Sequence, residues 1–177
     1  MSGLAAGGSD SAFAWFSVTN VPPALDSLYL RGRSVTNGGI NNTGWVFVRL
    51  VKPALSTSKS VNPSGTQLPG TELTYTMTFT NGGTADAANV TIVDSLATQV
   101  QFKVGSVVSN LPAGVTAVVE YSNDGGASWT YTPVSGGCSA PVNFDGCVNR
   151  VRWTFQNPLS SGAPNNTGDV RLVARIK

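Results

Sequence analysis

Apolar and polar residues alternate along short segments of this chain, most clearly over residues 71–80. In the stretch "TELTYTMTFT", Leu73, Tyr75 and Met77 occupy every second position and threonines lie between them. Because successive side chains of a strand point to opposite faces, this pattern predicts a strand with one buried face. Weaker patterns predict further strands at 54–61, 89–94, 100–108, 115–121, 127–132, 149–156 and 169–176.

The predicted strands are short and are separated by glycine, proline and asparagine, and no window repeats its apolar residues at helical spacing. Seven or eight strands of this kind predict an antiparallel β-sandwich, which we place at residues 53–177. Within it, "YSNDGGASWTY" predicts a hairpin, with positive φ angles at residues 123–126. A calcium site at Asp124 is disfavoured, because the loop offers only one carboxylate.

Charged residues make up only 11% of the 177 residues, and the net charge is +2. This charge is too small and too scattered for binding to nucleic acid or to an anionic membrane. A surface rich in uncharged polar side chains suits an extracellular β protein. No segment is long and apolar enough to insert into a membrane, and no signal peptide is visible.

The two cysteines, Cys138 and Cys147, lie in a loop that contains glycine and proline. We expect a disulfide between them, with two free thiols as the alternative. A zinc site is excluded, because the chain has no histidine and no further cysteine. No other metal site and no cofactor is predicted.

The run from Leu55 to Leu96, "LSTSKSVNPSGTQLPGTELTYTMTFTNGGTADAANVTIVDSL", resembles the bacterial and archaeal cell-surface repeat family catalogued as domain of unknown function eleven. The similarity follows, in order, Lys59, Pro63, the turn at Gly70, the alternating strand, the turn Asn81-Gly82-Gly83 and the strand from Val90 to Asp94. The stretch "YSNDGGASW" is similar to a hairpin in many members, so that the resemblance covers roughly residues 53–177.

This resemblance implies an immunoglobulin-like sandwich on an exported cell-surface protein, with no established enzymatic activity. Members usually carry the domain in tandem. Here it occurs once, after 52 residues that do not make a second copy.

A phrase occurs twice, as "NNTGWVFVRLV" at residues 41–51 and as "NNTGDVRLV" at residues 165–173. The extra two residues preserve strand parity, so Val48 and Leu50 correspond to Val170 and Leu172. "FAWFSVTN" (13–20) precedes the first copy much as "VRWTFQN" (151–157) precedes the second. Residues 1–52 therefore resemble the last two strands of a sandwich without the others, and we interpret them as a β-hairpin extension.

A two-stranded hairpin is marginally stable alone, so its apolar residues need a partner. The extension either folds back on its own sandwich or adds its strands to a neighbouring copy, which we favour. A third interpretation is that it is a remnant of a longer tandem protein. The register of its first strand stays open. The predicted subunit-contact residues are Phe13, Trp15, Phe16, Trp45, Val46, Val48 and Leu50.

Enzymatic activity is not expected, because histidine is absent and the nine carboxylates form no recognisable pattern. The prediction is a structural subunit of an extracellular, cell-surface filament or pilus-like polymer, joined head to tail with copies of itself by β-strand addition. The alternative is a carbohydrate-binding or adhesion module from a tandem-repeat protein, with the four tryptophans offering stacking surfaces. Three sequons, at Asn41, Asn89 and Asn165, could accept glycans.

Overall fold

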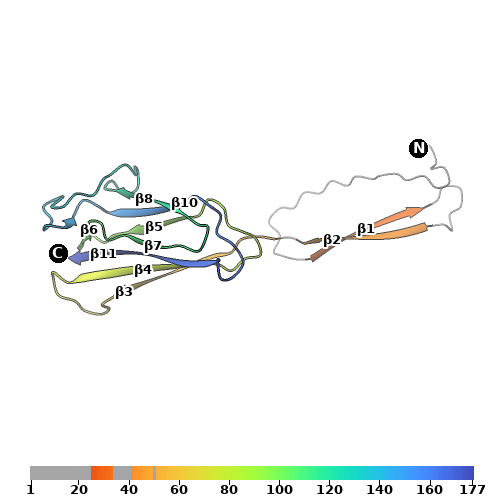
Figure 1. Cartoon of the computed structure of the whole chain (residues 1–177), viewed down its shortest axis with the longest axis horizontal. Helices are drawn as coiled ribbons and strands as arrows, with labels where there is room; N and C mark the ends of the chain where they lie inside the picture. Colours follow the sequence, from red (N-terminus) through yellow and green to blue (C-terminus); the bar gives the residue numbers. More distant parts are fainter. Residues whose placement is uncertain (1–24, 34–40, 50) are drawn as a thin grey trace. The chain divides into compact units, whose positions relative to one another are not determined.

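The computed structural model describes residues 25–33, 41–49 and 51–177, with the backbone alone for the first two ranges. Contacts within the chain divide it into two units, residues 1–52 and 53–177, and each unit is described by itself. All regular elements in the described residues are β-strands (Figure 1).

In the first unit, β1 (Leu25–Arg33) and β2 (Asn41–Arg49) pair antiparallel as a two-stranded sheet. Leu28 lies opposite Val46 and Tyr29 opposite Trp45. The strand predicted at residues 13–20 lies outside the described residues, and β1 was not predicted. Residues 41–49 of the first copy of the doubled phrase thus form β2, and the strand paired with it, β1, lies in the sequence between the two expected strands.

The second unit contains nine strands. Six of them coincide with predicted strands: β3 (Leu55–Asn62), β4 (Glu72–Asn81), β5 (Thr91–Ser95), β8 (Ala117–Ser122), β10 (Arg150–Phe155) and β11 (Thr167–Ile176). The segment predicted at 100–108 is divided into β6 (Val100–Lys103) and the beginning of β7 (Val108–Asn110). The short strand β9 (Phe144–Asp145) was not predicted.

The strand predicted at 127–132 is wrong, because this segment contributes only an isolated bridge between Tyr121 and Tyr131. The preceding turn differs in detail as well. Gly125 and Gly126 have the expected positive φ angles of 76° and 90°, whereas Asn123 and Asp124 do not. The carboxylate of Asp124 instead organises the loop by accepting hydrogen bonds from the hydroxyl and N–H groups of Ser128 and from the hydroxyl of Ser122, which hold its pKa well below its usual range.

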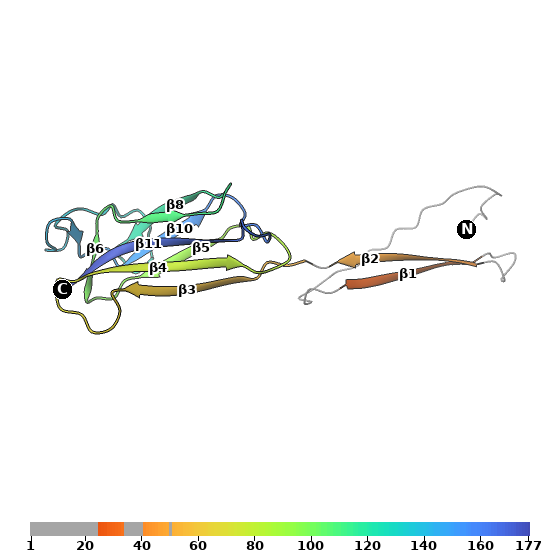
Figure 2. The ribbon, with the colours of Figure 1, turned by 60° about the horizontal axis from the view of Figure 1, so that its bottom comes forward.

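The strands of the second unit form two antiparallel sheets (Figures 1 and 2). The larger sheet has the order β3-β4-β11-β6-β9, with β7 also paired to β11, and the smaller sheet has the order β5-β10-β8. The last strand, β11, therefore lies inside its sheet, while β3 and β5 are edge strands. Two antiparallel sheets confirm the all-β prediction and are consistent with a β-sandwich.

One apolar core lies between the two sheets. Trp153 of the smaller sheet and Leu172 of the larger one are both completely buried. The rings of Phe79 and Phe155, one from each sheet, meet edge to face with centroids 5.1 Å apart. The alternating segment at 71–80 supplies Leu73, Met77 and Phe79 to this core, as its pattern predicts.

The second copy of the doubled phrase shows which of its side chains face the core. Val170 and Leu172 are fully buried, and Arg171 between them is exposed. Gly168 has no room for a side chain, because a Cβ atom there would lie 2.6 Å from the Phe79 ring. In this copy, alternate positions from the glycine onward therefore face the core.

Candidate strand-binding groove

The smaller sheet leaves part of the larger one uncovered, next to β3. Every residue of β3 is exposed, although Thr57 and Lys59 lie opposite the buried residues Phe79 and Met77 of β4. Directly opposed residues of neighbouring strands share a face of the sheet. The inner face of β3 is therefore solvent-exposed, and this includes the apolar residues Leu55 and Val61, which are 51% and 37% exposed.

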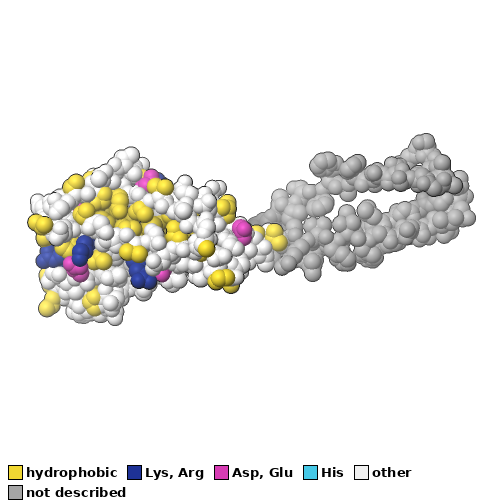
Figure 3. Space-filling view, viewed as in Figure 1, with side chains coloured by type: hydrophobic (Ala, Val, Ile, Leu, Met, Phe, Trp, Pro, Cys, Tyr) yellow, Lys and Arg dark blue, Asp and Glu magenta, His cyan; other side chains and the backbone are white. Residues whose placement is uncertain are grey.

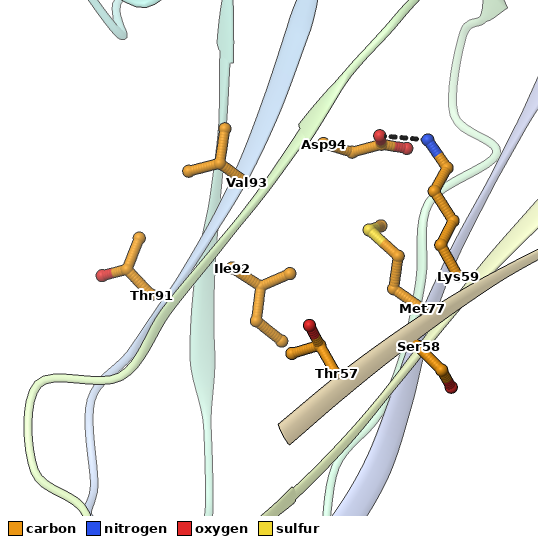
Figure 4. A pocket seen from close by; sticks show the side chains of 8 residues that line it. All are labelled: Thr57, Ser58, Lys59, Met77, Thr91, Ile92, Val93 and Asp94. Carbon is orange, nitrogen blue, oxygen red and sulfur yellow. Dashed lines mark hydrogen bonds and ion pairs between the residues drawn. The ribbon is translucent and has the colours of Figure 1, made fainter. Parts of the chain in front are cut away.

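A groove of about 290 Å³ lies between β3 and β5, the edge strands of the two sheets (Figure 4). The side chains of Thr57, Met77 and Ile92 point toward one another in it. Val93 lies on the opposite side of β5 and is 44% exposed. The groove is lined by Thr57, Ser58, Lys59, Met77, Thr91, Ile92, Val93 and Asp94.

An ion pair crosses this groove, from Lys59 on β3 to Oδ1 of Asp94 on β5. Asp94 is 3% exposed, and its second oxygen, Oδ2, is buried without a hydrogen-bond partner in the described part of the chain. The Lys59 ammonium also lies 4.6 Å from the centre of the Tyr75 ring. Burial, and next the negative charge of Asp94, raises the pKa of Tyr75. The groove thus contains a buried hydrogen-bond acceptor, Oδ2 of Asp94, that has no donor among the described residues.

The hairpin of the first unit carries apolar residues on both of its faces. The register places Leu28 opposite Val46 on one face, and Tyr29 opposite Trp45 on the other. Phe47 shares the face of Trp45, and Val48 shares the face of Val46. Either face of this two-stranded sheet would therefore expose large apolar residues to water unless something covers it.

The structure places three of the predicted contact residues, Trp45, Val46 and Val48, in β2. Val46 and Val48 share a face and Trp45 lies on the other one. Phe13, Trp15, Phe16 and Leu50 lie outside the described residues. Lys59 and Asp94 were not predicted as a pair, because nothing in the sequence pattern joins positions 35 residues apart.

Cys138 and Cys147 form a disulfide, as predicted. Disulfides persist in oxidising environments such as the extracellular space, so this bond indicates such a compartment. Among the residues that the structure describes, no helix is long and apolar enough to span a membrane. Charged side chains are sparse and scattered on the face of the second unit shown in Figure 3.

The two tryptophans with described side chains differ in their surroundings. Trp153 is completely buried in the core, as its strand pattern predicts. Trp129 lies outside the core cluster, half-buried, and the Arg152 guanidinium lies 4.3 Å from the centre of its ring. Arg152 is held there by hydrogen bonds of 3.0 and 2.8 Å to Glu120. One face of Trp129 is thus covered and does not offer a free surface for a sugar ring.

The second unit is an all-β fold with two antiparallel sheets and a disulfide, and its two edge strands β3 and β5 flank one groove. No family model, no curated protein and no solved structure matched the chain. The similarity of residues 53–177 to domain of unknown function eleven therefore stays a prediction.

Proposed function

We propose that this chain is a structural subunit of an extracellular, cell-surface filament or pilus-like polymer. Subunits join head to tail when the N-terminal extension of one adds its strands to a neighbouring copy. The observation that carries this proposal is the hairpin β1–β2, which has apolar residues on both faces and no further strand paired to it among the described residues.

The physical argument rests on what an isolated hairpin lacks. Two strands alone bury too little apolar surface to be stable in water, and independent stability needs a third strand or a packed layer. Burial of each large aliphatic side chain contributes about 1.5–3 kcal/mol. Addition to another sheet supplies both main-chain hydrogen bonds and pockets for alternate side chains. Because each subunit both donates and accepts, the contact repeats, and a contact of this kind that does not close on itself produces a filament.

The doubled phrase supports the same function. In β11 this phrase forms a strand with neighbours on both sides, β4 and β7, and it buries Val170 and Leu172. In β2 the equivalent phrase has one described neighbour, β1. A sequence that suits the interior of a sheet is thus present a second time at an edge, which favours the addition of that edge to another sheet.

The proposal includes a more specific fold and an extracellular location for this chain. We assign residues 53–177 to an immunoglobulin-like sandwich of the surface-repeat family, and residues 1–52 to a donor extension. Without the short strands β7 and β9, the second unit has seven strands. Numbered in chain order, the larger sheet contains the first, second, seventh and fourth of them, and the smaller sheet contains the third, sixth and fifth. Constant immunoglobulin domains have the fifth and seventh strands exchanged relative to this order. An extracellular location agrees with the disulfide.

The test is the double substitution Val48→Asp and Leu50→Asp. These charges fall on the face that corresponds to Val170 and Leu172, so assembly of the purified protein should be lost. Thr43→Asp, a change at a polar position of the same strand, is the control and should still polymerise. Light scattering and electron microscopy measure assembly, and circular dichroism checks that the sandwich stays folded. Unchanged polymers in the double variant, or wild-type protein that remains monomeric at high concentration, would refute the proposal.

A further inference from the structure

We infer that the groove between β3 and β5 is the acceptor site for a strand from a second copy of this chain, and that the strand is β2. It adds to the open edge of β5 and places Val46 and Val48 in the groove. This inference rests on the proposed function, which does not itself say where on the subunit the extension binds.

The backbone of β5 presents free hydrogen-bonding groups to the groove side. Phe155 donates to the carbonyl of Val90, and Leu96 donates to the carbonyl of Asn149, in register with the pairing of β5 and β10. In an antiparallel pair the residues that bond to the neighbour alternate with residues that do not. Ile92 and Asp94 therefore bond to β10. The N–H and C=O groups of Thr91, Val93 and Ser95 face the open edge, where the described residues place no strand.

A strand added at this edge would lie beneath the exposed inner face of β3. Leu55 and Val61, on that face, are 51% and 37% exposed, and Met77 and Ile92 line the groove beside it. Alternate side chains of the added strand point toward β3, and the others point to the outer surface of the smaller sheet. The groove therefore needs an extended segment with small or medium apolar residues at every second position.

The strand β2 meets these requirements. One of its edges is paired with β1, and no strand among the described residues is paired with the other edge. Val46 and Val48 alternate along it, on the face that corresponds to the buried residues of β11. Asn42 shares the face of Val46 and Val48. The amide group of an asparagine side chain can donate a hydrogen bond, and Oδ2 of Asp94 has no donor in the described residues.

Other edges of the described sheets suit an added strand less well. Tyr131 bridges to Tyr121 at the outer edge of β8. At the far edge of the larger sheet, β9 is only two residues long. β3 has an edge of eight residues, but its inner face is already uncovered, so a strand added there would have no opposite layer to pack against. The edge of β5 is five residues long and pairs with part of the nine-residue β2.

A pair of neighbouring substitutions tests the site in the full-length protein. Thr57→Glu adds a charge on the inner face of β3, within the groove, whereas Ser56→Glu adds the same charge on the outer face of the same strand. Both positions are exposed, so both variants should fold. We expect Thr57→Glu to raise the concentration for half-maximal assembly about tenfold or more, because the added strand would desolvate an unpaired carboxylate. Ser56→Glu should assemble like the wild type.

A crosslinking experiment tests the contact directly. Chains carrying Val48→Cys are mixed with chains carrying Thr57→Cys under oxidising conditions, and a covalent dimer is expected on a non-reducing gel. Replacing the second partner by Ser56→Cys should abolish it. If wild-type protein polymerises but Thr57→Glu does so equally well, or the dimer does not depend on which face carries the cysteine, the acceptor site is wrong and the filament proposal stands. If the wild type does not polymerise, both fail.

Discussion

Asn81 lies at the end of β4, and replacing it by aspartate should destabilise the second unit strongly. The side chain is completely buried and makes four hydrogen bonds to the backbone. Its Oδ1 accepts from the N–H groups of Ala54 and Gly83, at 3.0 and 3.1 Å. Its Nδ2 donates to the carbonyls of Ala85 and Leu159, at 2.9 and 3.1 Å. Asn81 thus joins the beginning of β3, a turn and the segment before β11.

Aspartate has nearly the same shape, so Asn81→Asp retains the two accepted hydrogen bonds. The second carboxylate oxygen then faces two carbonyl oxygens in place of the donor. The loss of the two donated hydrogen bonds and the buried charge that is left without a partner together cost about 3–5 kcal/mol. We expect a loss of about 3–5 kcal/mol at pH 7, a large part of the 5–15 kcal/mol that is typical of a whole domain.

The loss should become smaller at low pH. Burial and the two carbonyls favour the neutral acid, so the folded-state pKa of the new carboxyl lies above its unfolded value of about 4. A group with a raised folded-state pKa stabilises the fold below its unfolded pKa and loses that contribution as pH rises. The neutral acid can also donate one of the two missing hydrogen bonds. The variant should therefore lose only about 1–3 kcal/mol near pH 3.

Urea unfolding of the full-length protein at pH 7 and pH 3, each compared with the wild type, measures both values. Asn149→Asp is the matched control, because Asn149 accepts a hydrogen bond from the N–H of Gly125 and the substitution preserves that acceptor. It should change the unfolding midpoint little. An Asn81→Asp variant as stable as the wild type, or one with the same loss at both pH values, would refute the reasoning.

Two further predictions concern the loop closed by the disulfide. Thiol labelling of denatured, unreduced protein should find no free cysteine, and Cys138→Ser with Cys147→Ser should lower the free energy of unfolding by about 2–3 kcal/mol; labelled thiols would contradict this. Burial, and next the hydrogen bond to Asp145, raises the pKa of Tyr131 to about 12. The contribution of the Tyr131 hydroxyl to stability should therefore be present below about pH 10 and decline toward pH 12. Tyr131→Phe should remove a component near pH 12 from the ultraviolet titration of the tyrosines. An unchanged titration would contradict this prediction.

The two-sheet fold of the second unit was largely predictable because several of its strands have one buried face. The alternation at residues 71–80 reports directly that Met77 and Phe79 face the core. The strand prediction at 127–132 was wrong although this segment alternates as well. Trp129 and Tyr131 alternate as strand residues do, but the loop is instead held by side-chain hydrogen bonds to Asp124 and Asp145.

The hairpin and the groove depend on features that the alternation of apolar and polar residues along a strand does not predict. In β1 the run Leu28-Tyr29-Leu30 is apolar at consecutive positions, so it shows no alternation, and this strand was missed. β3 was predicted as a strand, but its complete exposure depends on how far the opposite sheet extends. Lys59 and Asp94 meet across 35 positions of sequence, and only the fold brings them together.

The ion pair between Lys59 and Asp94 affects which strand can bind at the open edge of β5. Proteins protect edge strands from indiscriminate pairing with inward-pointing charges, lysine above all. Lys59 is such a charge, but Asp94 neutralises it and keeps one buried oxygen unpartnered. A purely apolar strand from another protein would fill the groove but leave that oxygen unsatisfied, as it already is in the described residues. In the proposed assembly, a strand that brings a donor at the correct alternate position satisfies this oxygen and gains about 1–3 kcal/mol over an apolar strand, so the ion pair favours the chain's own extension over other apolar strands.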